Sequence, residues 1–300
     1  MKKVVGLGAN VLDTLITCKT FPTEDKKTKA EGIVRLGGGP VGNALVVLAK
    51  LGVPSEMIGT FSDDTAGVQI LAELQKFGVK TDRAVTVSGT SSFVSYILIS
   101  GENGSRTCLF DRGTVPDDPS LVDFSVIDGA DILHLDGNYM KSAIAAAKYA
   151  REKGVKVSLD AGGVYDGILE LLPLIDILIP SAEFAMAVTG EPDAKTALEA
   201  LYKMYSPEIL VVTDGKNGGY YWENGRAVHY DIAPATVRDT NGAGDTFHGA
   251  FIAAYAKGKS VPEACDFASA VAAYKCKHIG ARDYELNEDI AQNIYAYLAD

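Results

Sequence analysis

Short apolar strand patterns alternate with longer helical patterns along this 300-residue chain, and this alternation restricts the fold more than any other feature. A buried strand is expected at residues 4–8, and an apolar helix at 41–51 ends at Gly52. Further strands are expected at 56–59, 131–135, 155–159, 176–179 and 208–212, further helices at 65–77, 142–153, 166–172, 244–257, 261–275 and 288–298, and a hairpin at 220–230. Such alternation predicts a doubly wound α/β fold with a mostly parallel sheet and helices on both faces.

Two regions interrupt the alternation. Residues 26–36 alternate polar and apolar side chains, while residues 91–100 and 105–110 form two strand patterns joined by a glycine-containing turn at 101–104. None of these is flanked by a crossover helix, so they predict a second, smaller sheet. No low-complexity linker or internal repeat divides the chain, and we therefore expect one domain spanning residues 1–300.

Charge and hydropathy exclude several kinds of partner. The formal net charge of −11 makes binding to nucleic acid or to an anionic membrane unfavourable. No apolar stretch approaches the roughly 18 residues that a transmembrane helix needs. The start of the chain lacks the pattern of a cleaved signal peptide, so we expect a cytoplasmic protein.

The most informative motif is the run at residues 239–250. Gly242 and Gly244 frame Ala243 and are followed at once by Asp245 and a helix of small apolar residues. A glycine-rich turn at a helix N-terminus presents free N–H groups and the positive end of the helix dipole, which suit a phosphate. An aspartate beside a phosphate is costly unless it takes a proton from an attacking hydroxyl. The alternative, that Asp245 is an ordinary helix N-cap, leaves the two glycines unexplained.

This run resembles the C-terminal signature of the ribokinase-like (PfkB) carbohydrate kinases. Residues 37–44, Gly-Gly-Gly-Pro-Val-Gly-Asn-Ala, resemble the N-terminal signature of the same family, and the two lie in the family's order about 200 residues apart. The resemblance covers essentially the whole chain. It implies a ribokinase-like fold, ATP-dependent phosphorylation of a sugar hydroxyl with Mg²⁺, a small β lid from about 14–36 and 91–112, and a homodimer formed through that lid.

The resemblance also implies a role for individual residues. Asp245 is expected to be the catalytic base, and the expected anion-binding residues are Gly242, Ala243 and Gly244. The residues expected to bind the sugar are Asp13, Gly38, Gly39 and Asn43. A buried carboxylate at Asp13 would accept hydrogen bonds from sugar hydroxyls and discriminate against substrates that lack them. The alternative for Asp13 is a turn-forming aspartate after the first strand.

The nucleotide motif is less specific. No Walker sequence is present, and Gly6-Leu7-Gly8 is only half of a dinucleotide fingerprint. Residues 213–218 follow a predicted strand, at whose carboxyl end open α/β sheets bind ligands. They are similar to the Thr-x-Gly-x-x-Gly with which the family contacts ATP phosphates. The expected nucleotide-binding residues are Thr213, Gly215, Lys216 and Gly218.

The chain departs from the family at its metal motif. Many members carry Asn-x-x-Glu after a central strand, where it organises Mg²⁺ through water; here Ser181 takes the place of the asparagine and Phe184 that of the glutamate. Glu183, displaced by one position, is the candidate for the metal's water shell, with an N-terminal helix charge as the alternative. Asp239, with carbonyls near Gly280, is the candidate for the monovalent-cation (K⁺) site of some relatives.

Other motifs bear on the substrate. Residues 104–112 look like ketohexokinase, and the pairs 247–248 and 275–276, with 37–40, look like sulfofructose kinase. Both phosphorylate ketoses, so the resemblance favours a ketose or ketose derivative. A nucleoside kinase of the same fold and a non-catalytic sugar-binding regulator are the alternatives. Arg112 is expected to meet either the transferring phosphoryl group, which we favour, or an anionic group on the substrate.

Overall fold

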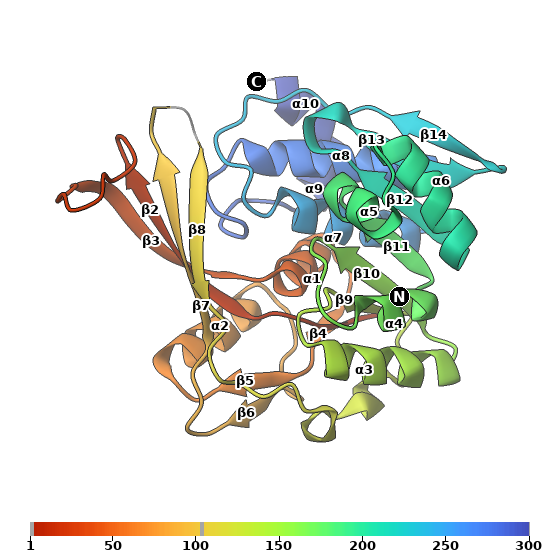
Figure 1. Cartoon of the computed structure of the whole chain (residues 1–300), viewed down its shortest axis with the longest axis horizontal. Coiled ribbons are helices and arrows are strands. Elements are labelled where there is room, and N and C mark those ends of the chain that lie inside the picture. The colour runs from red at the N-terminus through yellow and green to blue at the C-terminus, as the bar shows by residue number, and fades with distance from the viewer. Residues whose placement is uncertain (1–2, 103–104, 300) are drawn as a thin grey trace.

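The computed structural model describes residues 3–102 and 105–299. Its main sheet has the strand order β14-β13-β12-β11-β10-β9-β1-β4 (Figure 1). These strands are β1 (Val4–Leu7), β4 (Ser55–Met57), β9 (Ile132–Leu135), β10 (Lys156–Ala161), β11 (Ile177–Pro180), β12 (Ile209–Thr213), β13 (Gly219–Glu223) and β14 (Arg226–Tyr230). Strands β4 to β12 in this order run parallel, and the β13–β14 hairpin adds an antiparallel edge. The mostly parallel sheet expected from the sequence is therefore confirmed.

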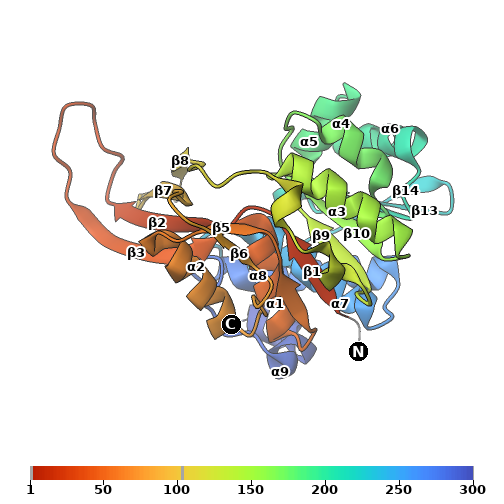
Figure 2. The ribbon, with the colours of Figure 1, turned by 90° about the horizontal axis from the view of Figure 1, so that it is seen from below.

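Helices cover both faces of this sheet (Figure 2). One layer contains α1 (Pro40–Lys50), α2 (Thr65–Lys76), α7 (Ala243–Ala256), α8 (Val261–Cys276), α9 (Glu288–Gln292) and α10 (Ile294–Ala299). The other contains α3 (Met140–Glu152), α4 (Ile168–Leu171), α5 (Ala182–Thr189) and α6 (Ala194–Tyr205). Short 3₁₀ turns are η1 (Pro119–Leu121), η2 (Phe124–Ile127), η3 (Leu172–Leu174) and η4 (Gly215–Asn217). Nowhere in these two stretches of chain is a helix long and apolar enough to cross a membrane.

The two layers enclose separate hydrophobic cores, because successive side chains of a strand point to opposite faces. In β11, Ile177 and Ile179 pack into the core beneath α1, α7 and α8, whereas Leu178 packs into the core beneath α3 to α6. Burial on both faces explains why these strands read as continuous apolar runs rather than as alternating patterns.

A second sheet stands beside the main body and has the order β3-β2-β7-β8. Its strands are β2 (Val11–Cys18), β3 (Ala30–Gly38), β7 (Phe93–Ser100) and β8 (Arg106–Asp111). The smaller sheet was expected to begin at about residue 14, but β2 begins at Val11, directly after β1. Asp13 therefore lies within a strand paired with Leu36 and Ser95, and the interpretation of a turn-forming aspartate was wrong. In the expected turn at 101–104, residues 103 and 104 lie outside the described residues.

No helix was predicted at 194–205, where α6 lies, and the other differences from the expected elements are local. A further two-stranded sheet of β5 (Thr60–Ser62) and β6 (Val85–Val87) escaped prediction because its strands are only three residues long. The helix expected at 288–298 is divided at Asn293 into α9 and α10. Asn287 caps α9 by accepting a hydrogen bond from the Ile290 N–H, and the N–H of Asn293 closes that turn on Asp289 and Ile290.

Close contact between α1 and α7 positions the functional residues. Gly249 in α7 lies against α1: a Cβ at this position would be 2.6 Å from the Ala44 carbonyl oxygen and 2.8 Å from Val47 Cβ. Glycine thus allows the two helix backbones to approach closely. Asn43 of α1 and Asp245 of α7 consequently come together although they are 202 residues apart in the sequence.

Candidate active site

The glycine-rich turn begins α7 as expected, and its geometry requires glycine at position 242. Gly242 is the N-cap of the helix with a φ of 75°, and a Cβ there would be 2.5 Å from Ala281 Cβ. The Thr246 N–H donates to the Gly242 carbonyl at 2.9 Å, and the Ala243 N–H donates to the Thr240 carbonyl at 3.2 Å, so the turn is closed on itself at the start of the helix. A Cβ on Gly244 would meet no atom within 4 Å, so open space faces this turn.

Asp245 is held by a side chain and is not the helix cap. Asn43 Nδ2 donates to Asp245 Oδ2 at 2.5 Å, and the cap position belongs to Gly242. The N-cap interpretation of Asp245 was therefore wrong. Burial, reinforced by the negative charge of Asp160, raises the pKa of Asp245 to about 6, against the lowering effect of the Asn43 hydrogen bond. A carboxyl with this pKa accepts a proton more readily than an ordinary aspartate and is still ionised at neutral pH.

Asp13 and the first glycine motif form a second part of the site. Ser95 Oγ donates to Asp13 Oδ1 at 2.5 Å, and burial raises the pKa of Asp13. A Cβ on Gly38 would be 2.1 Å from Asp13 Oδ2, and one on Gly39, whose φ is 94°, would be 2.0 Å from the Ala9 carbonyl oxygen. The glycines therefore allow the chain that enters α1 to pass directly beside the carboxylate.

Arg282 connects these parts and was not predicted. Its side chain is 0% exposed, with Nε donating to Asn43 Oδ1 and Nη2 donating to the Gly38 carbonyl oxygen, both at 2.7 Å. Because Asn43 accepts from the arginine through Oδ1, its amide nitrogen must face Asp245. Arg282 belongs to no sequence motif that we recognised. Its role became visible only through its tertiary contacts.

A buried polar group lies behind Asp245 and was also missed. His248 Nε2 lies 3.3 Å from Asp160 Oδ1, and His134 Nδ1 lies 3.2 Å from Ser158 Oγ. Burial opposes ionisation of Asp160, yet the neighbouring His248 ring holds the pKa of that carboxyl below its usual range. His134, Ser158 and Asp160 lie within buried strands, and His248 lies on the buried face of α7, so all four looked like core positions in the sequence.

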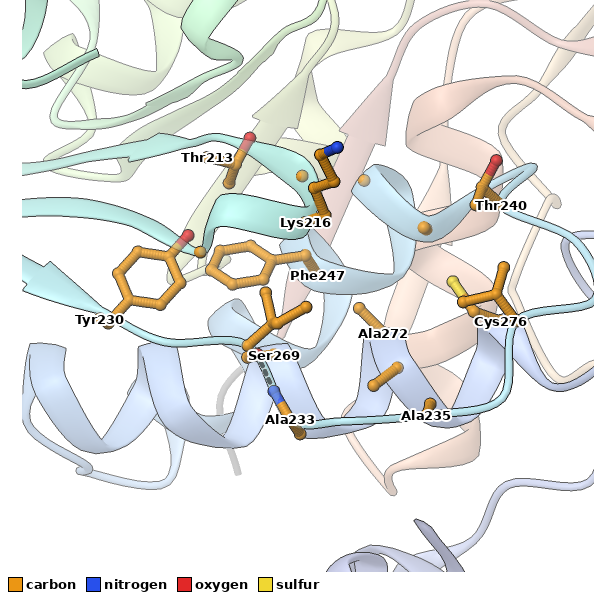
Figure 3. A pocket seen from close by; sticks show the side chains of 17 residues that line it. Thr213, Lys216, Tyr230, Ala233, Ala235, Thr240, Phe247, Ser269, Ala272 and Cys276 are labelled. Carbon is orange, nitrogen blue, oxygen red and sulfur yellow. Dashed lines mark hydrogen bonds between the residues drawn. The ribbon is translucent and has the colours of Figure 1, made fainter.

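The expected nucleotide residues line a cavity of about 290 Å³ together with the α7 turn (Figure 3). Thr213, Gly215, Lys216 and Gly218 form one side of it, next to Ala243 and Gly244. Apolar walls that the sequence did not predict come from the hairpin, the following loop and helices α7 and α8: Tyr230, Ile232, Ala233, Ala235, Val237, Phe247, Ala272, Ala273 and Cys276. An apolar slot leading to free N–H groups suits a flat heterocycle attached to phosphates.

The candidate Mg²⁺ residue is isolated. Glu183 is exposed in the first turn of α5, whereas Phe184 packs in the core. Within residues 3–102 and 105–299, no group of three or more His, Cys, Asp or Glu side chains could hold a metal. One carboxylate at the carboxyl end of β11 still fits Mg²⁺, which commonly keeps several waters and takes one or two carboxylates plus phosphate oxygens.

The candidate monovalent-cation residue has other partners. Asp239 Oδ1 accepts from the Asn241 N–H and Oδ2 from the Gly280 N–H, both at 2.8 Å. Lys275 Nζ donates to the Asp239 carbonyl oxygen at 2.8 Å and lies 3.8 Å from Oδ2. Gly280 thus offers Asp239 an N–H group and not a carbonyl oxygen. The Lys275 ammonium lies beside the Asp239 carbonyl and carboxylate oxygens, which are the atoms that a bound cation would use. This arrangement does not fit a bound K⁺.

The lid residues Arg106 and Arg112 reach different parts of the site. Arg106 Nη1 donates to Thr240 Oγ1 at 3.2 Å, beside the α7 turn. Arg112 lies 5.7 Å from the Phe93 ring centre and 5.3 Å from that of Tyr165, and its Nη1 donates to the Asn138 carbonyl at 3.4 Å. Asn138 and Tyr165 follow β9 and β10. The contacts of Arg112 are therefore on the side of the site away from the nucleotide cavity at β12.

Comparisons with known proteins show which sequences and folds are similar to this chain. The model of the pfkB family carbohydrate kinases matches residues 1–288. The chain is 28% identical to the ATP-dependent ribose-1-phosphate kinase of Halopiger xanaduensis, over 97% of each protein. It is 26% identical to the ketohexokinase of Mus musculus, over 92% of this chain and 96% of the relative. The structure of Arabidopsis thaliana ribokinase complexed with ribose and ATP is similar, with a TM-score of 0.85 and 27% identity over 98% and 99% of the two chains.

Replacing Gly242 with alanine should impair turnover more than stability. The new Cβ strains a positive φ and collides with Ala281, so the turn cannot keep its N–H groups aligned. Losing one oriented donor typically costs ~10²–10³-fold in turnover. Gly258→Ala is the matched control, because Gly258 also has a positive φ of 86° but no atom within 4 Å of the added Cβ. Equal turnover of the two purified variants would contradict the assignment.

Asp245→Asn should keep the fold and lower phosphoryl transfer by roughly 10²–10⁴-fold, because the amide cannot accept the proton. Steady-state kinetics measure the loss, and thermal unfolding checks that the variant is folded. Asp289→Asn, a change on the exposed surface of α9, serves as the control. Turnover above half of the wild-type value in Asp245→Asn would show that another group is the base.

The pKa of Asp245 also predicts the pH dependence. The base works only when ionised, so kcat/KM should be constant at neutral pH and fall about tenfold per pH unit below about 6. Replacing Asp160 with asparagine removes a negative charge that raises this pKa, and the acidic limb should move to lower pH. A kcat/KM that is constant from pH 5 to 8 would contradict the role of Asp245 as the base. An acidic limb at the same pH in Asp160→Asn and in wild type would contradict the influence of Asp160.

Proposed function

The chain belongs to the pfkB family of carbohydrate kinases, and from that premise we propose that it transfers the γ-phosphoryl group of ATP to a hydroxyl of a ketose or ketose derivative. It is an ATP-dependent sugar or nucleoside kinase by family, and the substrate class is our inference. One observation carries the kinase assignment. Asn43 holds Asp245 at the α7 turn, between Asp13 on one side and the nucleotide cavity on the other.

The proposed reaction uses Asp245 as the general base. The substrate oxygen forms a bond to the γ-phosphorus while the bond from phosphorus to the β–γ bridging oxygen breaks, and the hydroxyl proton passes to Asp245. The turn of Gly242, Ala243 and Gly244, at the positive end of the α7 dipole, would stabilise the negative charge of the transferring group. Their electrostatic effect is strong because the turn is fixed before the reaction begins.

The cavity and the residues at its edge suggest where the nucleotide and the metal would bind. The adenine ring would lie between the hairpin and α8, with the phosphates near Gly215 and Lys216. Mg²⁺ would bind the phosphates, reach Glu183 through its water shell and neutralise charge. An enzyme that consumes ATP fits a cytoplasmic location.

The sugar would occupy the space between Asp13 and Asp245. Asp13 can accept hydrogen bonds from two hydroxyls, and Gly38 and Gly39 let the chain that enters α1 run directly beside this carboxylate. The nucleoside-kinase alternative shares all of this machinery. The non-catalytic alternative is disfavoured, because a protein that only binds sugar has no use for an aligned base and anion-binding turn.

The lid also suggests how copies of the chain associate. Large apolar side chains on the face of the lid opposite to that of Asp13 are exposed by 49–63%: Ile33, Tyr96 and Leu109. Clusters of this kind are typical of interaction surfaces. We infer a homodimer formed through the lid, which sedimentation of the purified protein would test; a monomer at micromolar concentration would contradict it.

The acceptor can be identified by measuring ADP release with a panel of ketoses, aldoses, sugar phosphates, sugar acids and nucleosides. The proposal predicts the largest kcat/KM for a ketose or one of its derivatives. Preference for a nucleoside would favour the alternative of the same fold. No ADP release with any acceptor, from a protein that binds ATP, would contradict the kinase assignment.

Arg112 should affect substrate affinity more than turnover. Its contacts with Phe93, Tyr165 and the Asn138 carbonyl place it away from the nucleotide cavity, so we favour an anionic group of the substrate over the phosphoryl group as its partner. Arg112→Ala should raise KM for the sugar roughly tenfold with little change in kcat. Arg83→Ala, which removes an exposed arginine paired with Asp123, is the control. A lower kcat of Arg112→Ala with an unchanged KM would show instead that Arg112 acts on the transferring phosphoryl group.

A further inference from the structure

Lys275 is a buried cation beside the phosphate-binding turn. It lies in the last turn of α8, its side chain is 0% exposed, and its ammonium faces the segment that leads into α7. Nζ donates to the carbonyl oxygen of Asp239 at 2.8 Å and lies 3.8 Å from the carboxylate Oδ2 of the same residue. Both oxygens are of the kinds that bind hard cations.

The position of Lys275 is costly unless it has a function. Removing an ammonium from water disfavours its charged form, and burial accordingly lowers the pKa of Lys275, against the Asp239 charge that raises it. Among the lysines of the described residues, Lys275 alone is buried. A lysine that served only to pack the end of α8 could be replaced by an apolar residue without this cost.

The surroundings of Asp239 show what the ammonium stabilises. The N–H groups of Arg238 and Asp239 donate to the Cys276 carbonyl at 2.8 and 3.1 Å, so this segment is anchored to the end of α8. The Asp239 carboxylate in turn accepts from the N–H of Asn241, which immediately precedes Gly242. Lys275 therefore completes a set of contacts that fixes the start of the anion-binding turn.

We propose that the Lys275 ammonium is a built-in replacement for the monovalent cation expected at Asp239, and that the enzyme consequently works without K⁺. Lys275 is a positioning residue: it acts on the turn through Asp239 and does not touch the reacting atoms. The predicted effects on turnover rest on the proposed kinase function. The predicted effect of salt on thermal unfolding does not, because it can be measured without a substrate.

The first experiment uses the wild-type protein and needs no variant. Turnover is compared in potassium chloride and in choline chloride at equal ionic strength, since choline is too large to enter a cation site. The two rates should agree within about twofold. A rate in choline chloride that is tenfold lower, and that recovers when K⁺ is added, would overturn the proposal.

Variants of Lys275 provide the second experiment. Lys275→Ala leaves a space lined by oxygens, so its turnover in choline chloride should fall roughly tenfold and recover in potassium or ammonium chloride, while KM for the sugar changes little. Lys275→Met fills the space without a charge, and its turnover should fall similarly without recovery. Lys277→Ala is the matched control, because Lys277 Nζ donates to the Tyr297 carbonyl, away from the turn. Wild-type turnover of Lys275→Ala in choline chloride would overturn the proposal.

Thermal unfolding separates this inference from the kinase assignment. Replacing choline chloride with potassium chloride should raise the Tm of Lys275→Ala by on the order of 2 °C relative to the same exchange in wild type and in Lys277→Ala, because only this variant gains a cation site. If no acceptor is phosphorylated but this pattern holds, the proposed function fails and the cation inference stands. An equal effect of K⁺ on all three proteins would overturn the inference even if the kinase activity is present.

Discussion

The side chain of Asn43 makes two hydrogen bonds on which the site depends. Its oxygen accepts from a buried guanidinium at Arg282, and its nitrogen donates to the carboxylate of Asp245. Three segments that are remote in the sequence are thereby held in one orientation: the start of α1, the start of α7 and the loop after α8. An asparagine suits this position because it offers an acceptor and a donor in one plane. The negative charges of Glu73, Asp13 and Asp245 favour the charged form of the buried Arg282.

The packing of the helical layer makes this alignment possible. Gly249 allows α7 to approach α1, and Gly242 allows the α7 turn to approach Ala281. Lys50, at the end of α1, donates to the carbonyl oxygens of Arg282 and Tyr284 at 2.6 and 2.5 Å, and so attaches the same loop to the same helix. The catalytic arrangement is thus supported by elements of the hydrophobic core and not by the loops alone.

The sequence predicted the main sheet, most helices of the two layers and the glycine-rich turn that begins α7, because local patterns encode them; α6 was missed. The doubly wound order follows from alternation, and the function of Gly242 follows from the turn that begins α7. Arg282, His248 and Asp160 could not be predicted in this way, since their roles arise from contacts between distant segments. Position 13 was ambiguous because β2 follows β1 after only three residues, and a turn and a strand looked alike there. The expectation for Asp239 depended on the resemblance, and Lys275 changes it through a contact that no local pattern reveals.

The hydrogen bond between Arg106 and Thr240 has a consequence for how the two ligands exchange. The lid strand β8 is joined by this bond to the residue before Asn241, so the lid must release that bond before β8 can swing away from the α7 turn. The nucleotide cavity, in contrast, is lined by β12, the hairpin, α7 and α8, with no residue from β2, β3, β7 or β8 among its walls. We therefore expect the two ligands to enter by separate routes: the lid controls the exchange of the sugar and its phosphorylated product, and ADP can be replaced by ATP while the lid stays closed.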